Sequence, residues 1–220
     1  MLFRSNGPIE TGKSTKSSRI ILPLVVAITA VTSCATLSVS STEDVCSIFR
    51  AKSGWHSTAV QMQEKWNLPL HVPMAIMYQE SKFKRKAKPP RRYLLGFIPW
   101  KRRSTAYGYA QALNGTWNNY ITETNSPGAR RTSFKDAYDF MGWYLTKSSK
   151  IANIEKDDTY RQYLAYHEGW TGYKRRSYDE KEWLKRVARE VDTLSVRYQQ
   201  QYQGCADDLN RGFWRRILPG

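Results

Sequence analysis

The chain has 220 residues, of which 40% are hydrophobic and 13% aromatic, a composition that supports one packed domain. Its 35 lysine and arginine residues outnumber its 19 acidic residues, so the net charge is +16. A mean hydropathy of -0.64 argues against a protein with many membrane spans.

The first 33 residues predict a bacterial signal peptide. Four basic residues precede an apolar run from Ile20 to Ser33, which is short for a membrane span of about 20 residues. The ending Val31-Thr32-Ser33-Cys34 resembles a lipoprotein signal, in which cleavage leaves Cys34 as the lipidated first residue. An ordinary secretory signal, or a membrane anchor with an incidental cysteine, is the alternative. Because Ala35 and not aspartate follows, we expect an anchor in the outer membrane that faces the periplasm.

The basic character of the chain does not come from this leader. Without the residues before Cys34, 31 basic and 18 acidic residues remain, a net charge of +13. Such an excess predicts an anionic partner. An exported protein rarely meets nucleic acid, so we expect no nucleic acid here. Membrane phosphates or an acidic cell-wall polymer fit the compartment better.

Cysteine usage agrees with export. Apart from Cys34, the chain holds Cys46 and Cys205. An even pair in an oxidising compartment predicts a disulfide, which would close a loop worth about 5 kcal/mol by the chain-entropy estimate. Two free thiols are the alternative.

The rest of the chain has a helical pattern, and the expected fold class is mostly α. Residues 34–45 are rich in serine and threonine and predict a tether, and Glu43 and Asp44 favour a helix start after a Ser/Thr cap. At most a short extended segment or hairpin is expected at Tyr93–Trp100. We expect the domain at 46–205 and a basic, aromatic tail at 206–220. The predicted apolar stripes are Trp55, Ala59, Met62 and Trp66; Val72, Ala75, Ile76 and Phe83; Phe134, Ala137, Tyr138, Met141, Tyr144, Leu145 and Ile151; Tyr160 and Leu164; and Trp183, Val187, Val191, Leu194 and Tyr198.

A cluster of ten basic residues without an acid lies between Lys82 and Arg103. One interpretation is a solvated loop. The other is a docking surface for an anionic polymer or membrane, with Tyr93, Phe97 and Trp100 as aromatic contacts.

No metal or cofactor is expected. His56, His71 and His167 do not have the spacing of metal ligands. The chain also lacks a serine-nucleophile elbow and a phosphate-binding glycine loop.

Glu80 is placed where its charge is unfavourable. The sequence predicts a helix with Pro73 in its first turn and an apolar stripe along one face. Glu80 follows Ile76 by four residues and so lies on that stripe. The basic, proline-containing segment from Lys84 to Pro90 ends the helix, so Glu80 falls in its last turn. Burial and the helix dipole both disfavour a carboxylate there and raise its pKa. A glutamate that reaches out to solvent, or that pairs with Lys84, is the alternative.

Three stretches together resemble the motifs of the soluble lytic transglycosylase family. They are Glu80-Ser81, Gly108-Tyr109-Ala110-Gln111 and Ala165-Tyr166-His167-Glu168-Gly169, in this order. The family carries a Glu-Ser pair at a helix end, then Gly-Leu-Met-Gln, then Ala-Tyr-Asn-x-Gly. The resemblance covers about Ser57 to Tyr198 and implies a lysozyme-like α domain.

The resemblance implies that the protein cleaves peptidoglycan between N-acetylmuramic acid and N-acetylglucosamine, leaving 1,6-anhydro ends. It implies Glu80 as the general acid and base, and Tyr166 as the tyrosine that hydrogen-bonds the acid. Ser81, Tyr109, Gln111 and His167 would contact the substrate or orient the acid. Tyr109-Ala110 replaces Leu-Met and His167 replaces the asparagine, departures that suggest a divergent branch.

Two other functions stay open. A hydrolytic, lysozyme-type muramidase would need a second carboxylate, such as Glu168, at the site. A non-catalytic envelope lipoprotein would bind the glycan without product. A glutamate beside Gly169 at a helix end is expected to be exposed, which disfavours Glu168 as a second catalytic group.

Overall fold

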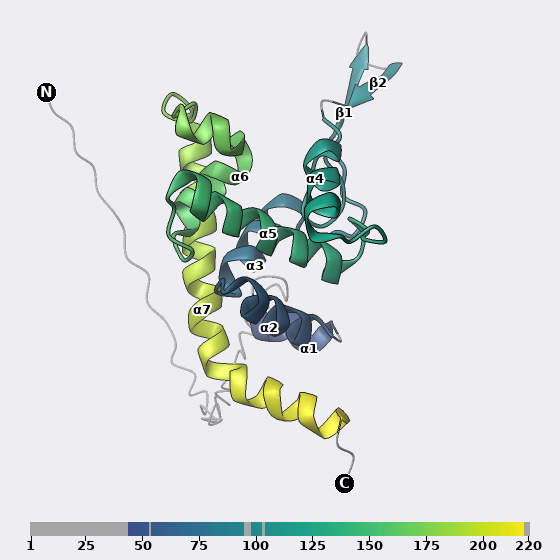
Figure 1. Cartoon of the computed structure of the whole chain (residues 1–220), viewed down its shortest axis with the longest axis vertical. Helices are drawn as coiled ribbons and strands as arrows, with labels where there is room; N and C mark the ends of the chain where they lie inside the picture. The colour runs from purple at the N-terminus through teal and green to yellow at the C-terminus, as the bar shows by residue number, and fades with distance from the viewer. Residues whose placement is uncertain (1–43, 53, 95–97, 103, 218–220) are drawn as a thin grey trace, which may run out of the picture. The chain divides into compact units, whose positions relative to one another are not determined.

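The computed structural model describes residues 44–52, 54–94, 98–102 and 104–217 (Figure 1). The mostly α fold class is confirmed, with one short hairpin. Cys34 and the predicted signal peptide lie outside the described residues. Within the described ranges, no helix is long and apolar enough to cross a membrane. The elements are α1 (Val45–Ala51), α2 (Trp55–Trp66), α3 (His71–Ser81), β1 (Arg91–Leu94), β2 (Ile98–Arg102), α4 (Asn114–Thr124), α5 (Phe134–Ala152), α6 (Thr159–Lys174) and α7 (Glu182–Ile217).

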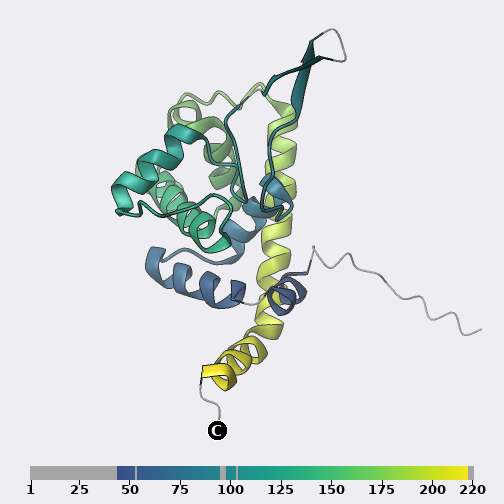
Figure 2. The ribbon, with the colours of Figure 1, turned by 90° about the vertical axis from the view of Figure 1, so that its right-hand side faces the viewer.

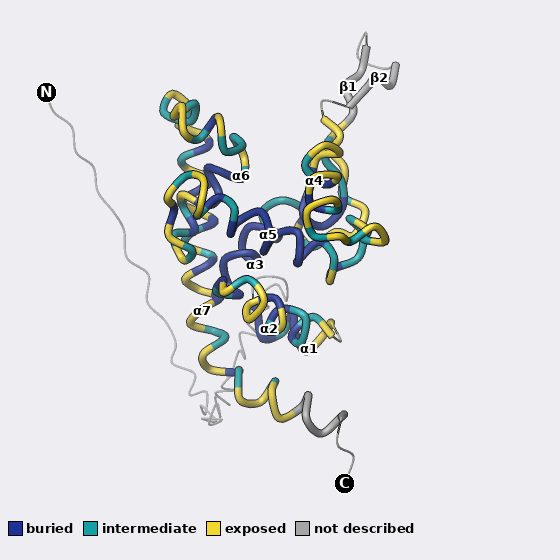
Figure 3. The backbone as a smooth tube through the Cα atoms, viewed as in Figure 1, coloured by how far each residue is buried: buried dark blue, intermediate teal, exposed yellow. Residues whose placement is uncertain are grey.

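Helix α3 is a core helix, so the prediction of one apolar stripe was too narrow. Every residue from His71 to Met77 is buried, because α3 packs against α5, α6 and α7 (Figure 3). At its start, His71 Nδ1 lies 2.8 Å from the Ser195 hydroxyl of α7. Thr159 of α6 donates to the same oxygen at 2.8 Å. This buried polar contact joins the three helices at one point.

Helix α7 passes α3 and α6 (Figures 1 and 2). Its buried face is offset from the predicted apolar stripe. The buried face begins at Leu184, whereas Trp183 is 49% exposed. Trp183 instead packs edge-on against His167 of α6. Ile151, predicted to be in the core, is 39% exposed because it lies in the last turn of α5. The buried residues of α7 include Leu184, Ala188, Val191, Ser195, Tyr198 and Cys205.

Asp139 of α5 joins three helices. Its carboxylate accepts hydrogen bonds from Lys65 Nζ at 2.7 Å, Trp66 Nε1 at 2.6 Å and the Tyr120 hydroxyl at 2.8 Å. Trp66 reaches it because Gly142 has no side chain: a Cβ there would lie 2.2 Å from the indole ring. α2 and α4 are thereby held on α5.

The hairpin and the chain end complete the fold. β1 and β2 pair antiparallel, in the region predicted to be extended. Residues 206–217, predicted as a tail, continue α7 without interruption to Ile217. Asp44, and not a serine or threonine, caps α1 by accepting from the Ser47 amide at 2.6 Å.

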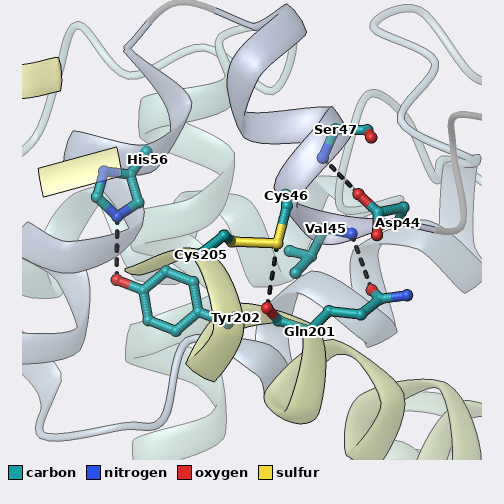
Figure 4. The surroundings of a disulfide bond; sticks show 8 residues. All are labelled: Asp44, Val45, Cys46, Ser47, His56, Gln201, Tyr202 and Cys205. Carbon is teal, nitrogen blue, oxygen red and sulfur yellow. Dashed lines mark hydrogen bonds between the residues drawn. A yellow bond between two sulfur atoms is a disulfide. The ribbon is translucent and has the colours of Figure 1, made fainter. Parts of the chain in front are cut away.

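A disulfide joins Cys46 of α1 to Cys205 of α7, across a separation of 159 residues (Figure 4). The same contact includes a hydrogen bond from the Val45 amide to Gln201 Oε1 at 3.0 Å and one between His56 Nε2 and the Tyr202 hydroxyl at 3.0 Å. The beginning and the end of the helical domain are thus covalently linked.

Replacing both cysteines with serine should lower the free energy of unfolding by about 2–5 kcal/mol, because the unfolded chain regains the freedom of a long loop. Urea unfolding under non-reducing conditions measures this difference. Reduced wild-type protein is the control and should unfold like the double variant. Equal stability of the oxidised wild type and the double variant would contradict the prediction.

Candidate active site

Glu80 lies in the last turn of α3, as predicted from the sequence. Lys82 and Phe83 follow with left-handed backbone angles, φ 49° and 56°, and turn the chain away from the helix axis. Lys84 therefore does not continue the helix face, and no ion pair between Lys84 and Glu80 occurs in the described structure. Glu80 keeps part of its surface open to solvent. The Glu80 carboxyl group is therefore largely removed from water but still accessible from the surface.

Burial raises the pKa of the Glu80 carboxyl from 4.5 to about 7. A hydrogen bond with the Tyr163 side chain and the charge of Lys82 oppose this rise, because both favour the ionised form. The carbonyl end of α3 disfavours the ionised form further. At neutral pH, Glu80 is therefore poised between its acid and base forms, as acid–base catalysis requires.

Tyr163 of α6 is the tyrosine that hydrogen-bonds Glu80, and it was not predicted from the sequence. It is 4% exposed. Burial, then the nearby Glu80 charge, raises the pKa of its hydroxyl, so Tyr163 stays protonated and donates. One sequence signal was available: Tyr163 precedes Tyr166 by three residues and thus shares its helix face.

Tyr166 also lies near Glu80, but its hydroxyl donates to the Ala110 carbonyl. Burial raises the pKa of Tyr166, and the Glu80 charge adds to this rise. Its ring packs edge-on against Tyr144 at 4.9 Å. Tyr166 therefore connects the acid to the second motif, at residues 108–111.

The second motif is a tight turn beside the loop that follows α3. Gly108 has φ +79°, and a Cβ there would lie 2.1 Å from the Arg131 carbonyl oxygen, so glycine is required. The Gly108 amide donates to the Ala87 carbonyl at 3.0 Å. Gln111 Nε2 donates to the carbonyls of Ala87 at 2.9 Å and Gly108 at 2.8 Å. The amide nitrogen of Gln111 thus holds the turn in place.

Two other predicted site residues point into the protein. Tyr109 is 9% exposed and packs edge-on against Trp55 and Phe134. Ser81 is 6% exposed, and its hydroxyl donates to the Met77 carbonyl one turn earlier, at 3.2 Å. Both side chains are therefore held inside the protein.

The residues of the third motif lie on two different faces of α6. Tyr166 faces Glu80, whereas the next residue, His167, is exposed and contacts Glu168 and Trp183. Gly169, with φ +71°, interrupts the helical backbone just beyond.

Glu168 was expected to be exposed, and this was wrong: its side chain is 5% exposed. Lys181 Nζ contacts both carboxylate oxygens at 2.8 and 2.7 Å, and the Ser177 hydroxyl donates to one of them. Burial alone would raise the pKa of Glu168. The hydrogen bonds from Lys181, Ser177 and His167 outweigh burial and lower that pKa to about 2. Glu168 is a fixed, ionised anchor between α6 and the start of α7.

Charged groups around Glu80 are few. Of the described residues, Lys82 is the charged neighbour that shifts its pKa, and no second carboxylate contributes. No group of three potential ligands capable of holding a metal ion occurs among these residues. The arrangement is suited to proton transfer by a single carboxyl group.

The chain matches the family described as transglycosylase SLT domain over residues 22–205. No curated protein and no solved structure is significantly similar to it.

Replacing Tyr163 with phenylalanine should raise the pKa of Glu80 further, because the lost hydrogen bond favours the carboxylate. Carbon-13 NMR of the glutamate carboxyls against pH measures this pKa. Tyr160→Phe, on the same helix, is the matched control and should leave it near 7. A Glu80 pKa that is unchanged or lower in Tyr163→Phe would show that Tyr163 does not act on the acid.

Proposed function

The chain belongs to the transglycosylase SLT domain family, and we propose that it is a peptidoglycan lytic transglycosylase whose general acid and base is Glu80. It would cleave the β-1,4 bond between N-acetylmuramic acid and N-acetylglucosamine without water. The family acts on peptidoglycan in the bacterial cell envelope.

The observation that carries this proposal is the state of Glu80. A free glutamate has lost its proton at pH 7, whereas burial brings the pKa of Glu80 to about 7. Such a carboxyl group both donates and accepts a proton at neutral pH. The catalytic acid of lysozyme, a glutamate whose pKa is raised by an apolar pocket, is a precedent for this way of keeping a proton.

The proposed reaction has two proton transfers at one residue. Glu80 first donates its proton to the glycosidic oxygen, and the bond from the muramic C1 to that oxygen breaks. The acetamido carbonyl of the muramic residue assists at C1. Glu80, now ionised, then takes the proton of the C6 hydroxyl as its oxygen bonds to C1. The acid is regenerated, and the product carries a 1,6-anhydro ring.

Other residues have supporting parts in this proposal. Tyr163 donates to Glu80 and holds its carboxyl, and Tyr166 positions the turn at Gly108–Gln111 through the Ala110 carbonyl. Gln111 and His167 are proposed to contact sugar, the first through its side-chain oxygen. Ser81 is proposed to fix the end of α3 through its bond to Met77.

The hydrolytic alternative is less well supported. A muramidase of the two-carboxylate type needs a second carboxylate near the bond to be cleaved. The candidate, Glu168, is already bound by Lys181 and Ser177. Releasing it would expose an uncompensated charge on Lys181.

We also propose that residues 1–33 are a lipoprotein signal and that Cys34 is lipidated, with the domain facing the periplasm from the outer membrane. The Ser/Thr-rich segment before α1 would be the tether. The basic residues between Lys82 and Arg103 would dock on anionic wall or membrane. The excess of basic residues in the chain supports this.

Glu80→Gln should reduce turnover of purified sacculi by ~10²–10⁴-fold or more, because one residue carries both proton transfers. Mass spectrometry should find muropeptides with 1,6-anhydro-muramic ends from wild type only. In wild type, turnover should fall as pH rises above about 7, because the protonated form of Glu80 is then lost.

Glu64→Gln, an exposed change of the same kind on α2, is the control and should keep full activity. Undiminished anhydro products from Glu80→Gln would remove Glu80 from the mechanism. Reducing-end products from wild type would instead indicate hydrolysis, and binding without product would indicate the non-catalytic alternative.

Cys34→Ser should release the protein from the membrane fraction of the producing bacterium, because the thiol that carries the lipid is gone. Fractionation with immunoblotting measures this. Cys46→Ser keeps Cys34 and is the control that should stay with membranes. Retention of Cys34→Ser in membranes would contradict lipidation at this residue.

A further inference from the structure

A pocket of about 360 Å³ lies next to the second motif and is separate from Glu80. Three segments meet there: the loop after α3, the segment after β2 and the loop before α5. Its lining residues are Lys88, Ser104, Thr105, Ala106, Tyr107 and Arg131.

Arg131 is fixed within this pocket. Its Nη1 donates to the carbonyls of Thr105 at 3.1 Å and Ala112 at 2.9 Å. Its guanidinium lies over the Tyr107 ring, 5.4 Å from the centroid. The group is therefore half-buried and held in one orientation, while Nη2 and Nε form no hydrogen bond within the described chain.

Lys88 supplies a second cation on the same ring. Its Nζ lies 5.1 Å from the Tyr107 centroid. In the described part of the chain, neither Lys88 nor Arg131 has an acidic partner. Elsewhere the fold pairs such groups: Lys65 with Asp139, Lys147 with Glu123 and Lys181 with Glu168. The pocket thus holds an aromatic ring and two positive charges. No acidic side chain among the described residues neutralises these charges.

This chemistry fits a carboxylate. A half-buried guanidinium with free N–H groups binds a planar carboxylate well, and a mobile ammonium adds charge. In a peptide-bearing peptidoglycan strand, the lactyl carboxyl group of each N-acetylmuramic residue is bound in an amide, so the free carboxylates of that polymer lie on its stem peptides.

The pocket also adjoins the turn at Gly108–Gln111. The Arg131 carbonyl accepts a hydrogen bond from the Tyr109 amide at 3.1 Å, and it lies so close to Gly108 that a Cβ there would be 2.1 Å from its oxygen. One residue thus supports the turn with its backbone and the pocket with its side chain.

We propose that Lys88 and Arg131 bind a free carboxylate of the stem peptide while the glycan lies at Glu80. This proposal rests on the proposed function for the identity of the polymer. It predicts that the protein binds strands with free stem carboxylates more tightly than strands whose carboxylates are amidated.

The experiment measures equilibrium binding to the Glu80→Gln protein, so that no turnover is needed. Three probes are compared: soluble glycan strands with stem peptides, the same strands with amidated stem carboxylates, and peptide-free strands whose lactyl carboxyl groups are amidated. The first should bind about fivefold more tightly than the other two, a ratio expected for one partly exposed ion pair.

Lys88→Gln in the same background should lower this ratio, because one of the two cations that bind the carboxylate is lost. Arg131→Gln should do so as well, but it loses two structural hydrogen bonds, so Lys88→Gln is the decisive variant. The matched controls are Lys150→Gln and Arg130→Gln, both exposed and outside the pocket, and both should keep the ratio.

An unchanged ratio in Lys88→Gln, or equal binding of all three probes, would overturn the pocket proposal. Tighter binding of amidated strands than of peptide-free strands would overturn it too, since the pocket would then read peptide and not charge. Product analysis of the wild type separates these results from the function. Absence of anhydro products alongside a Lys88-dependent ratio would reject the transglycosylase reaction and keep the pocket.

Discussion

The site depends on the burial of α3. This helix packs against α5, α6 and α7, and all its residues from His71 to Met77 are buried. Its axis therefore ends inside the protein, and the last turn carries Glu80 into an environment poor in water. Desolvation is the largest influence on the pKa of Glu80. The disulfide between α1 and α7 and the contact of His71 with Ser195 keep α7 against this helix.

Two tyrosines of α6 lie near Glu80 and have different partners. Tyr163 faces the carboxyl group and limits the rise of its pKa. Tyr166 donates to Ala110 and so fixes the distance between the acid and the turn at Gly108. If Tyr163 were absent, the acid would hold its proton more tightly and regain it more readily, but would donate it less well. The pKa near 7 is thus a balance between burial on one side and Tyr163 with Lys82 on the other.

The sequence predicted what depends on spacing along the chain. Helical periodicity indicated α3 and placed Glu80 in its last turn, and the even pair of cysteines indicated the disulfide. The errors concern contacts between elements. Trp183 is as apolar as Leu184, and only the packing of α7 on α3 and α6 decides which one is buried. Glu168 looked like an exposed residue because Lys181 and Ser177 reach it from 13 and nine residues away. Tyr163 was missed because it is not part of the motif, and its spacing of three residues from Tyr166 was the one signal for it in the sequence.

The need to keep Glu80 protonated limits where basic residues can lie. A general acid must keep its proton near pH 7, and every cation close to it favours the ionised form. Lys82 already lowers the pKa of Glu80, whereas Lys88 and Arg131 are not among the groups that shift it. Cations placed beside Glu80 to attract an anionic polymer would lower the pKa of its carboxyl group, and Glu80 would then have no proton to donate at neutral pH. With the cations on the other side of the Gly108–Gln111 turn, the two tasks that we propose are separate: the pocket would bind a carboxylate of the polymer, and the sugars would meet a Glu80 carboxyl group that still carries its proton.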